Sequence, residues 1–200
     1  MPLWEVTIMN KNIVLCGVGG QGTVLASKLL AAAAMEREIP VMSAETIGMA
    51  QRGGSVFSHL RMGDDLYSPM IGSGSADVII GFEPGETVRM LPYLKKGGHV
   101  IVSSRAIMPV TASLSKSSYS SETMLSYLKE QVKNLTIVDG DLACQQIGSP
   151  KVLNMVLLGA AAKTGELGVT LDEIKEVMKK RLAPKFHEKN LQALDWYQKN

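Results

Sequence analysis

A glycine-rich stretch near the start of the chain is the segment best suited to binding chemistry. It reads Gly17-Val18-Gly19-Gly20-Gln21-Gly22-Thr23 and contains the G-x-G-x-x-G spacing at positions 17, 19 and 22. Glycine permits positive φ and lets a ligand approach the backbone closely. An apolar strand-like run, 13–16, precedes the stretch and an alanine-rich helical segment follows it. The unpaired amides of that helix's first turn would therefore face an anionic group.

Spacing alone does not identify the ligand of this loop. A nucleotide site needs an acidic residue for the ribose at the end of the second strand, about 20 positions on. Glu45 follows Gly17 by 28 positions (45 − 17 = 28). A P-loop needs Lys-Ser/Thr after the last glycine, whereas Thr23-Val24 stand here. The alternative interpretation involves no ligand: the glycines would serve only to let the helix pack closely on the strand.

A second polar cluster is Gln51-Arg52-Gly53-Gly54. A guanidinium between flexible neighbours suits a phosphate, a carboxylate or a contact with another subunit. A solvated loop arginine is the alternative.

The remaining polar residues form no catalytic set. His59, His99 and His187 lack companions at a readable spacing, so hydrogen-bonding roles are expected. There is no nucleophile elbow, paired-carboxylate pattern or H-E-x-x-H motif. Cys16 and Cys144 are the two cysteines and belong to no C-x-x-C motif, so neither zinc nor an iron–sulfur cluster is expected on this chain. The pattern indicates part of an enzyme whose chemistry lies elsewhere.

Composition limits the classes of protein. Two hundred residues, 46% of them hydrophobic, suit one α/β domain spanning 1–200. A net charge of +2 does not favour nucleic acid, and no run approaches the ~20 apolar residues of a membrane span. Two isolated cysteines and the lack of a signal peptide predict the cytoplasm.

Hydrophobic periodicity predicts alternating strands and helices. Strands are expected over 11–16, 41–44, 55–62, 66–70, 76–82, 99–103 and 135–139. Helices are expected over 22–37, 84–94, 121–133, 140–148, 151–163 and 170–181, with an amphipathic piece from 184 onward. The segment 105–120 is expected to be irregular, Gly97-Gly98 to end a helix, and Thr170 with Glu173 to form a capping box.

This alternation predicts a three-layer α/β/α sandwich with a Rossmann-like, mostly parallel sheet. The turn 63–65 predicts an antiparallel hairpin between 55–62 and 66–70. Ligands of such sheets lie beyond the carboxyl ends of the strands. The glycine loop, the end of the second strand and the loop after residue 80 are expected to meet there.

Taken together, these motifs resemble a known family. The glycine loop and the run 43–56, which contains Glu45 and Gln51-Arg52-Gly53-Gly54, are similar to the gamma unit of 2-oxoacid:ferredoxin oxidoreductases. The runs 67–71 and 76–77, with Phe82-Glu83-Pro84, Arg89 and Asn154, look most like the small (beta) subunit of the indolepyruvate branch. The resemblance spans nearly the whole chain.

The resemblance implies a reaction. A 2-oxoacid, here indolepyruvate or another arylpyruvate, is decarboxylated oxidatively to an acyl-coenzyme A, and ferredoxin is reduced. Thiamine diphosphate and [4Fe–4S] clusters would lie on a larger partner subunit, with coenzyme A as co-substrate. This chain would be the subunit without thiamine, inactive alone. Binding of coenzyme A or another anion by the glycine loop is an inference from the helix-terminus argument.

Two other functions stay open from the sequence. One is a free-standing Rossmann-type nucleotide-binding oxidoreductase with Glu45 on the ribose. The other is an adenylating enzyme of the ubiquitin-activating type, whose paired C-x-x-C ligands are missing here. A homodimer is an alternative for the isolated chain, which would cover an apolar patch with a second copy.

Overall fold

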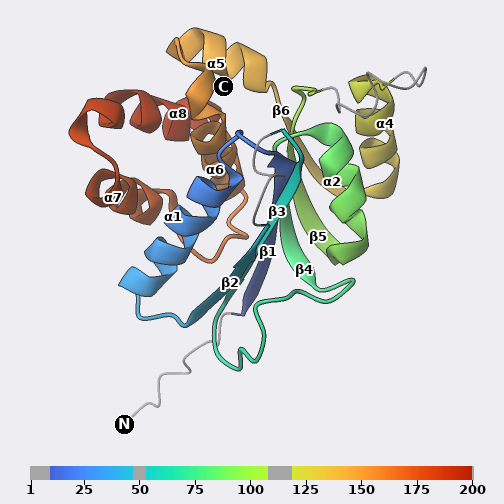
Figure 1. Cartoon of the computed structure of the whole chain (residues 1–200), viewed down its shortest axis with the longest axis horizontal. Coiled ribbons are helices and arrows are strands. Elements are labelled where there is room, and N and C mark those ends of the chain that lie inside the picture. Colours follow the sequence, from blue (N-terminus) through green and yellow to red (C-terminus); the bar gives the residue numbers. More distant parts are fainter. Residues whose placement is uncertain (1–9, 47–52, 108–118, 200) are drawn as a thin grey trace.

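The computed structural model describes residues 10–46, 53–107 and 119–199. One mixed sheet has the strand order β2-β3-β1-β4-β5-β6 (Figure 1). Its strands are β1 (Lys11–Val18), β2 (Val41–Glu45), β3 (Ser55–Met62), β4 (Ala76–Gly81), β5 (Leu94–Ser103) and β6 (Asn134–Val138). The α-helices are α1 (Thr23–Glu36), α2 (Pro84–Met90), α4 (Ser121–Gln131), α5 (Gly140–Ile147), α6 (Leu153–Lys163), α7 (Leu171–Arg181) and α8 (His187–Lys199).

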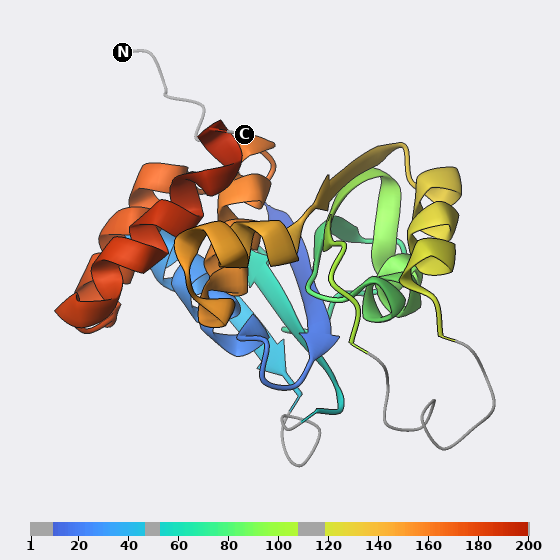
Figure 2. The same cartoon turned by 90° about the horizontal axis from the view of Figure 1, so that it is seen from above.

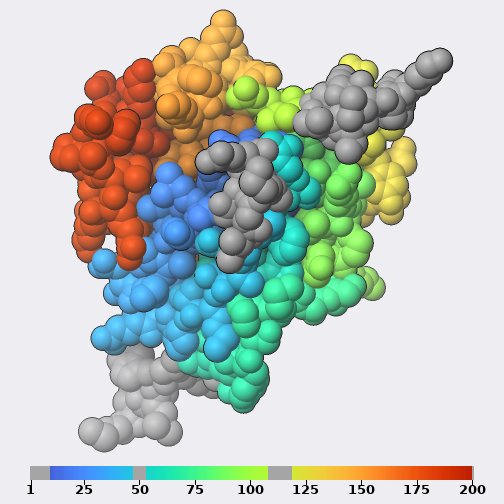
Figure 3. All heavy atoms as spheres, in the orientation of Figure 1, coloured from blue at the N-terminus to red at the C-terminus, as the bar shows by residue number. Residues whose placement is uncertain are grey.

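The predicted three-layer arrangement is confirmed, because alternate residues of β1 belong to two separate cores. Ile13 and Leu15 pack into the core formed with α1 and α6. Val14 and Cys16 belong to the core on the other face, with residues of α4. Figures 1 and 2 show α1, α6, α7 and α8 on one side of the sheet and α2 and α4 on the other. In the surface view these two helical groups occupy opposite flanks of the molecule (Figure 3).

The sheet is mostly parallel, as expected, but the antiparallel pairs are not the pair that was predicted. β3 runs against both of its neighbours, β1 and β2, whereas β1, β4, β5 and β6 pair in parallel. The prediction of a strand over 66–70 is wrong. Both edges of β3 are already occupied by β1 and β2, so the chain after the turn 63–65 has no free edge on β3 to join. The antiparallel hairpin is therefore formed by β2 and β3.

A second correction concerns Gly97-Gly98, which lie inside β5 and do not end a helix. Helix α2 stops at Met90 and passes into a single 3-10 turn, Leu91–Tyr93. Gly97 has a φ of 78°, and the pairing of β5 with β4 shifts register at this point. Glycine tolerates this backbone conformation, so the strand bends and continues.

Side-chain caps begin several helices. The capping box of Thr170 and Glu173 is present, as predicted. The cap of α4 is Ser120, whose Oγ accepts a hydrogen bond from the amide of Thr123. A capped first turn fixes where each helix leaves the preceding loop.

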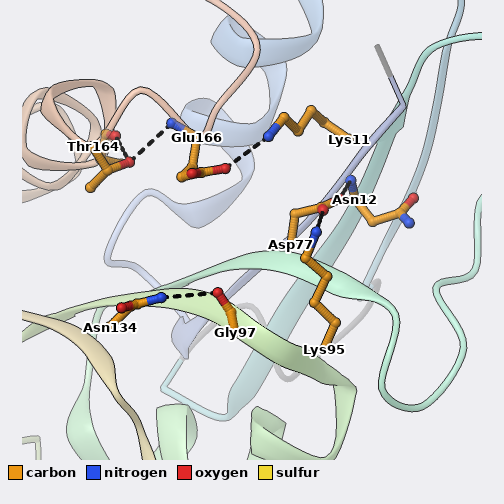
Figure 4. A network of polar contacts seen from close by, with 9 residues as sticks. Lys11, Asn12, Asp77, Lys95, Gly97, Asn134, Thr164 and Glu166 are labelled. Atoms are coloured by element: carbon orange, nitrogen blue, oxygen red, sulfur yellow. Dashed lines mark hydrogen bonds and ion pairs between the residues drawn. The ribbon is translucent and has the colours of Figure 1, made fainter. Parts of the chain in front are cut away.

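Polar contacts link the amino ends of the parallel strands to one another and to the connection between α6 and α7 (Figure 4). Asp77 accepts a hydrogen bond from the amide of Asn12 at 2.7 Å and pairs with Lys95, which ties β1, β4 and β5 together. Lys11 pairs with Glu166 at 2.9 Å in the connection between α6 and α7. These contacts lie at the amino ends of the strands, opposite the carboxyl edge where the glycine loop lies.

We predict that Gly159→Ala destabilises the protein, although alanine is ordinarily the better helix former. A Cβ at residue 159 of α6 would lie 2.1 Å from the backbone oxygen of Leu194 in α8. Overpacking of this kind costs about 1–3 kcal/mol, against a gain of about 1 kcal/mol from helix propensity. Urea unfolding measures the balance.

Gly72→Ala is the matched control, because a Cβ there meets no atom closer than 3.7 Å. A rise in the stability of Gly159→Ala would contradict the close packing of α6 on α8.

Candidate functional site

The glycine loop connects the carboxyl end of β1 to α1 and is closed by the side chain of Gln21. The Oε1 atom of Gln21 accepts a hydrogen bond from the amide of Val18 at 2.7 Å. Its Nε2 donates to the carbonyl of Phe82, just after β4, at 2.9 Å. The expected meeting of the loop with the segment after residue 80 is thus confirmed. Gln21, predicted as a ligand-binding residue, joins two strand ends here.

Two of the motif glycines are required by packing. A Cβ at Gly17 would lie 2.7 Å from the Cβ of Phe82. Gly22 caps α1 with a φ of 86°, and a Cβ there would lie 2.8 Å from the Nδ2 of Asn154. Gly20, by contrast, has no atom within 4 Å of its Cβ position. Packing therefore accounts for the motif at its two ends, while the middle of the loop is open.

The segment containing Gly53 and Gly54 lies beside this loop, as expected. The amide of Gly19 donates to the carbonyl of Gly54 at 2.8 Å, and the amide of Gly53 donates to the carbonyl of Gly19 at 3.1 Å. Gln51 and Arg52 lie outside the described residues. Two backbone hydrogen bonds thus hold the described part of the second polar cluster against the first.

Glu45 does not come to the glycine loop. It is the last residue of β2 and pairs with Ser58 of β3, which in turn pairs with Leu15 of β1. Two strand spacings, about 9–10 Å, therefore separate Glu45 from β1. In a Rossmann-type site the strand with the acidic residue lies directly beside the first strand. Because β3 lies between β2 and β1, Glu45 is not in the position from which an acidic residue contacts the ribose in a Rossmann-type site.

A pocket of about 480 Å³ opens on the other side of the glycine loop. Gly19 to Gly22 form one wall, Arg105 follows β5, and Lys151 and Asn154 come from the helical run that leads into α6. Thr23 begins α1 next to the pocket and is itself buried. The pocket brings two cations and an amide together from segments far apart in the sequence.

Arg105 is positioned by its surroundings. Its amide donates to the Oγ of the buried Ser103 at 3.1 Å, and its Nε lies 3.3 Å from a carboxylate oxygen of Asp141. Sequence patterns did not single out Arg105 or Lys151, because each is a lone cation in a loop. Asn154 was singled out only through the family resemblance. No pattern along the sequence could indicate the pocket, because it forms only when the end of β5 and the start of α6 come together in the fold.

A pair of buried carboxyl groups, Glu83 and Glu86, lies on the α2 side of the same edge. Glu83 caps α2 by accepting from the amide of Glu86 at 2.9 Å, and it also accepts from the hydroxyl of Tyr119. Ser55 donates to Glu86 at 2.5 Å. Burial raises the pKa of Glu83 above its usual value, although the two hydrogen bonds oppose this shift. In the sequence, Glu83 was singled out only as part of the Phe82-Glu83-Pro84 run that resembles the family.

The histidines have the structural roles that were expected. His59 is fully buried, and its Nδ1 accepts from the amide of Ile71 at 3.0 Å. His99 and His187 also have polar partners, at 3.3 Å and 2.8 Å. Burial lowers the pKa of His59 and favours its neutral form.

The two cysteines are buried in different cores, Cys16 on the α2 and α4 side and Cys144 on the α1 and α6 side. Burial raises the pKa of both thiols. Within residues 10–46, 53–107 and 119–199, no group of three or more His, Cys, Asp or Glu could hold a metal ion. In the same ranges, no helix is long and apolar enough to cross a bilayer.

Comparison with known proteins gives matches over nearly the whole chain. The family model described as pyruvate ferredoxin/flavodoxin oxidoreductase matches residues 12–196. Indolepyruvate oxidoreductase subunit IorB of Pyrococcus horikoshii is 38% identical over 186 residues, which cover 92% of each chain. The pyruvate/ketoisovalerate oxidoreductases common subunit gamma of Thermococcus kodakarensis is 31% identical over 189 residues, 90% of each chain.

Solved structures share this fold. The pyruvate oxidoreductase subunit of Thermotoga maritima superposes with a TM-score of 0.70 at 21% identity, covering 96% of both chains. The 2-oxoglutarate:ferredoxin oxidoreductase of Magnetococcus marinus superposes with a TM-score of 0.71 at 18% identity, covering 95% of this chain and 30% of that one. The same fold therefore occurs both as a separate chain and within a longer one.

We predict that Glu83→Gln removes a pH dependence of stability. Because burial raises the folded-state pKa of Glu83, the unfolded chain loses this proton first as the pH rises above 4.5. The free energy of unfolding should fall between that pH and the raised pKa and then level off. Urea unfolding at a series of pH values measures the slope, which should be flatter in Glu83→Gln.

Glu130→Gln, at an exposed position on α4, serves as the control and should keep the wild-type slope. An unchanged slope in Glu83→Gln would show that Glu83 does not carry this pH dependence.

Proposed function

The chain belongs to the pyruvate ferredoxin/flavodoxin oxidoreductase family, and on that premise we propose that it is the subunit of a 2-oxoacid:ferredoxin oxidoreductase that does not bind thiamine diphosphate. The observation that carries this function is the match, over 92% of both chains, to a relative named as an oxidoreductase subunit. In this role the chain, as one gamma-type unit, supports oxidative decarboxylation of a 2-oxoacid to an acyl-coenzyme A in the cytoplasm.

We place thiamine diphosphate and the [4Fe–4S] clusters on a larger partner subunit, which passes electrons to ferredoxin. Thiamine diphosphate supplies the carbanion chemistry when it is bound. A cluster needs about four thiolate ligands, and the two cysteines here are buried in cores on opposite faces of the sheet. These residues do not fit a cluster site, which supports the proposed division of labour.

The preferred substrate class is an arylpyruvate such as indolepyruvate. Relatives named as indolepyruvate oxidoreductase subunits are 34–38% identical to this chain. Those named as common gamma subunits of pyruvate/ketoisovalerate oxidoreductases are 28–31% identical. The difference in identity supports the indolepyruvate branch.

We further propose that the carboxyl edge of the sheet contacts the partner subunit through the glycine loop and Gln51-Arg52-Gly53-Gly54. The hydrogen bonds between Gly19 and Gly53-Gly54 support this, because they combine the two segments into one surface. Main-chain groups at such an edge, with small side chains, allow close approach of another protein.

We predict that the purified chain releases no carbon dioxide from indolepyruvate when thiamine diphosphate is added. Co-expression with the larger subunit should restore reduction of ferredoxin that depends on indolepyruvate and coenzyme A. Decarboxylation by the isolated chain would contradict the division of labour.

Size-exclusion chromatography of the isolated chain reports whether it forms a homodimer.

Calorimetry separates this function from a free-standing nucleotide-binding oxidoreductase. Tight binding of NAD or FAD by the isolated chain, without a response to coenzyme A, would favour that alternative. The distance of two strand spacings between Glu45 and β1 argues against it.

We predict that Arg52→Ala weakens assembly with the larger subunit, because a guanidinium at a contact offers several directed hydrogen-bond donors. The apparent affinity for the larger subunit and the turnover of the complex are the quantities to measure. Arg181→Ala, in the last turn of α7, is the control. Full assembly and turnover in Arg52→Ala would exclude a major role for this residue.

A further inference from the structure

We propose that a groove at the amino edge of the sheet, where the parallel strands begin, is a docking site for an acidic segment of the larger subunit. We call it the lysine groove, and its main lining residues are Val88, Leu91, Leu94, Lys96, Tyr127 and Lys133. The chemistry of the occupant follows from these residues. Only the identity of the partner rests on the proposed function.

The lysine groove lies at the edge of the sheet opposite the glycine loop. It has a volume of about 770 Å³ and is lined by α2, the start of β5 and the end of α4. Figures 1 and 2 show α2 and α4 side by side on one face of the sheet. A partner bound there would make a second contact, separate from the one proposed at the carboxyl edge.

A wide bulge in β5 brings two lysines to the groove. β5 pairs with β4 at Leu94 and again at His99, and its pairing with β6 begins only at His99. The four residues 95–98 of β5 therefore lie opposite the single residue Asp77 of β4, and all four line the groove. Bulges turn side chains away from the regular strand direction. The ladder is thus interrupted where Lys95 and Lys96 reach the groove.

The charge of the groove is positive, and two of its three lysines are uncompensated. Lys95 forms an ion pair with Asp77. Lys96 and Lys133 are exposed, and neither has an ion-pair partner within the described part of the chain. Among the described residues, no carboxylate lines the groove. Aspartate and glutamate side chains of another chain are the complementary groups for such a surface.

Apolar side chains provide a place for a large apolar residue of the partner. Val88, Leu91 and Leu94 are partly buried and pack against the core on the α2 and α4 face of the sheet. Tyr127 of α4 is 45% exposed. Tyrosine is enriched among the residues that contribute most to protein interfaces. We therefore expect the docking segment to carry a large apolar side chain flanked by aspartate or glutamate.

The exposure of the polar groups favours a protein segment over a small molecule. Pockets for small molecules orient the ligand with a few precisely placed polar groups inside a mostly enclosed site. In the lysine groove the polar side chains of Lys95, Lys96, Gln131 and Lys133 are all exposed. An apolar centre surrounded by exposed polar groups is the arrangement of a protein–protein interface.

Carbodiimide cross-linking of the complex with the larger subunit tests the docking site. The reagent condenses a lysine amine with a carboxylate that touches it, so no spacer is added. We expect mass spectrometry to find Lys96 or Lys133 joined to aspartate or glutamate of the larger subunit. Cross-links from these lysines to a second copy of this chain, or none from either lysine, would overturn the proposal.

Substitutions in the groove measure its contribution to affinity for the larger subunit. Lys96→Glu and Lys133→Glu should each weaken binding by about tenfold, with a smaller effect at high salt. Tyr127→Ala should weaken it by about tenfold at any salt concentration. All three side chains are exposed, and circular dichroism verifies that the variants are folded.

Two matched controls lie outside the groove and should bind like the wild type. Lys28→Glu reverses an exposed charge on α1, and Phe186→Ala removes a ring that is 49% exposed before α8. Wild-type affinity in all three groove variants would contradict the docking site. A homodimer of the isolated chain that Lys96→Glu dissociates would assign the groove to a second copy and would also contradict it.

Failure of the docking site is distinguishable from failure of the proposed function. A wild-type complex that assembles and reduces ferredoxin supports the function. Groove variants that bind normally in that complex would then exclude the docking site alone. If the wild-type chain forms no complex with the larger subunit, both are wrong.

Discussion

The antiparallel strand β3, paired on both of its edges, is the constraint on which the rest of the molecule depends. It separates β2 from β1 and gives the sheet its order β2-β3-β1-β4-β5-β6. Because β3 enters the sheet from the carboxyl edge, it brings Gly53-Gly54 against the loop that leaves β1. The same pairing sets Glu45 two strands away from β1. Strand β3 thus has two effects: it places Gly53-Gly54 beside the glycine loop, and it keeps Glu45 away from the position of a ribose-binding residue.

The carboxyl edge of the sheet carries opposite charges on its two sides. Glu83 and Glu86 are buried next to α2. Arg105 and Lys151 line the pocket next to α1 and α6. Gln21 lies between these groups and holds the end of β1 to the segment after β4 with two hydrogen bonds. On the basic side, Arg105 pairs with the exposed Asp141, whereas Lys151 has no ion-pair partner among the described residues.

The fold of this chain is not confined to separate subunits. The fold superposes on 30% of a 2-oxoglutarate:ferredoxin oxidoreductase chain, so it is also found as one part of a longer polypeptide. In the separate chain, the same carboxyl edge offers backbone groups, small residues and a positively charged pocket. Under the proposed division of labour, such a surface would position a ligand or a partner, and the cofactor on the larger subunit would supply the reactive chemistry.

The sequence by itself determined the elements whose signals are local. Hydrophobic alternation predicted β1, β4 and β6, the Thr170–Glu173 box predicted the start of α7, and glycine spacing predicted the loop after β1. Only the tertiary structure decided which strands β3 pairs with, that β5 continues through Gly97, and that Gln21 bridges two strand ends. It also brought Arg105, Lys151 and Asn154 into one pocket. Local patterns arise from neighbours along the chain, whereas strand pairing and the convergence of loops depend on contacts between distant residues.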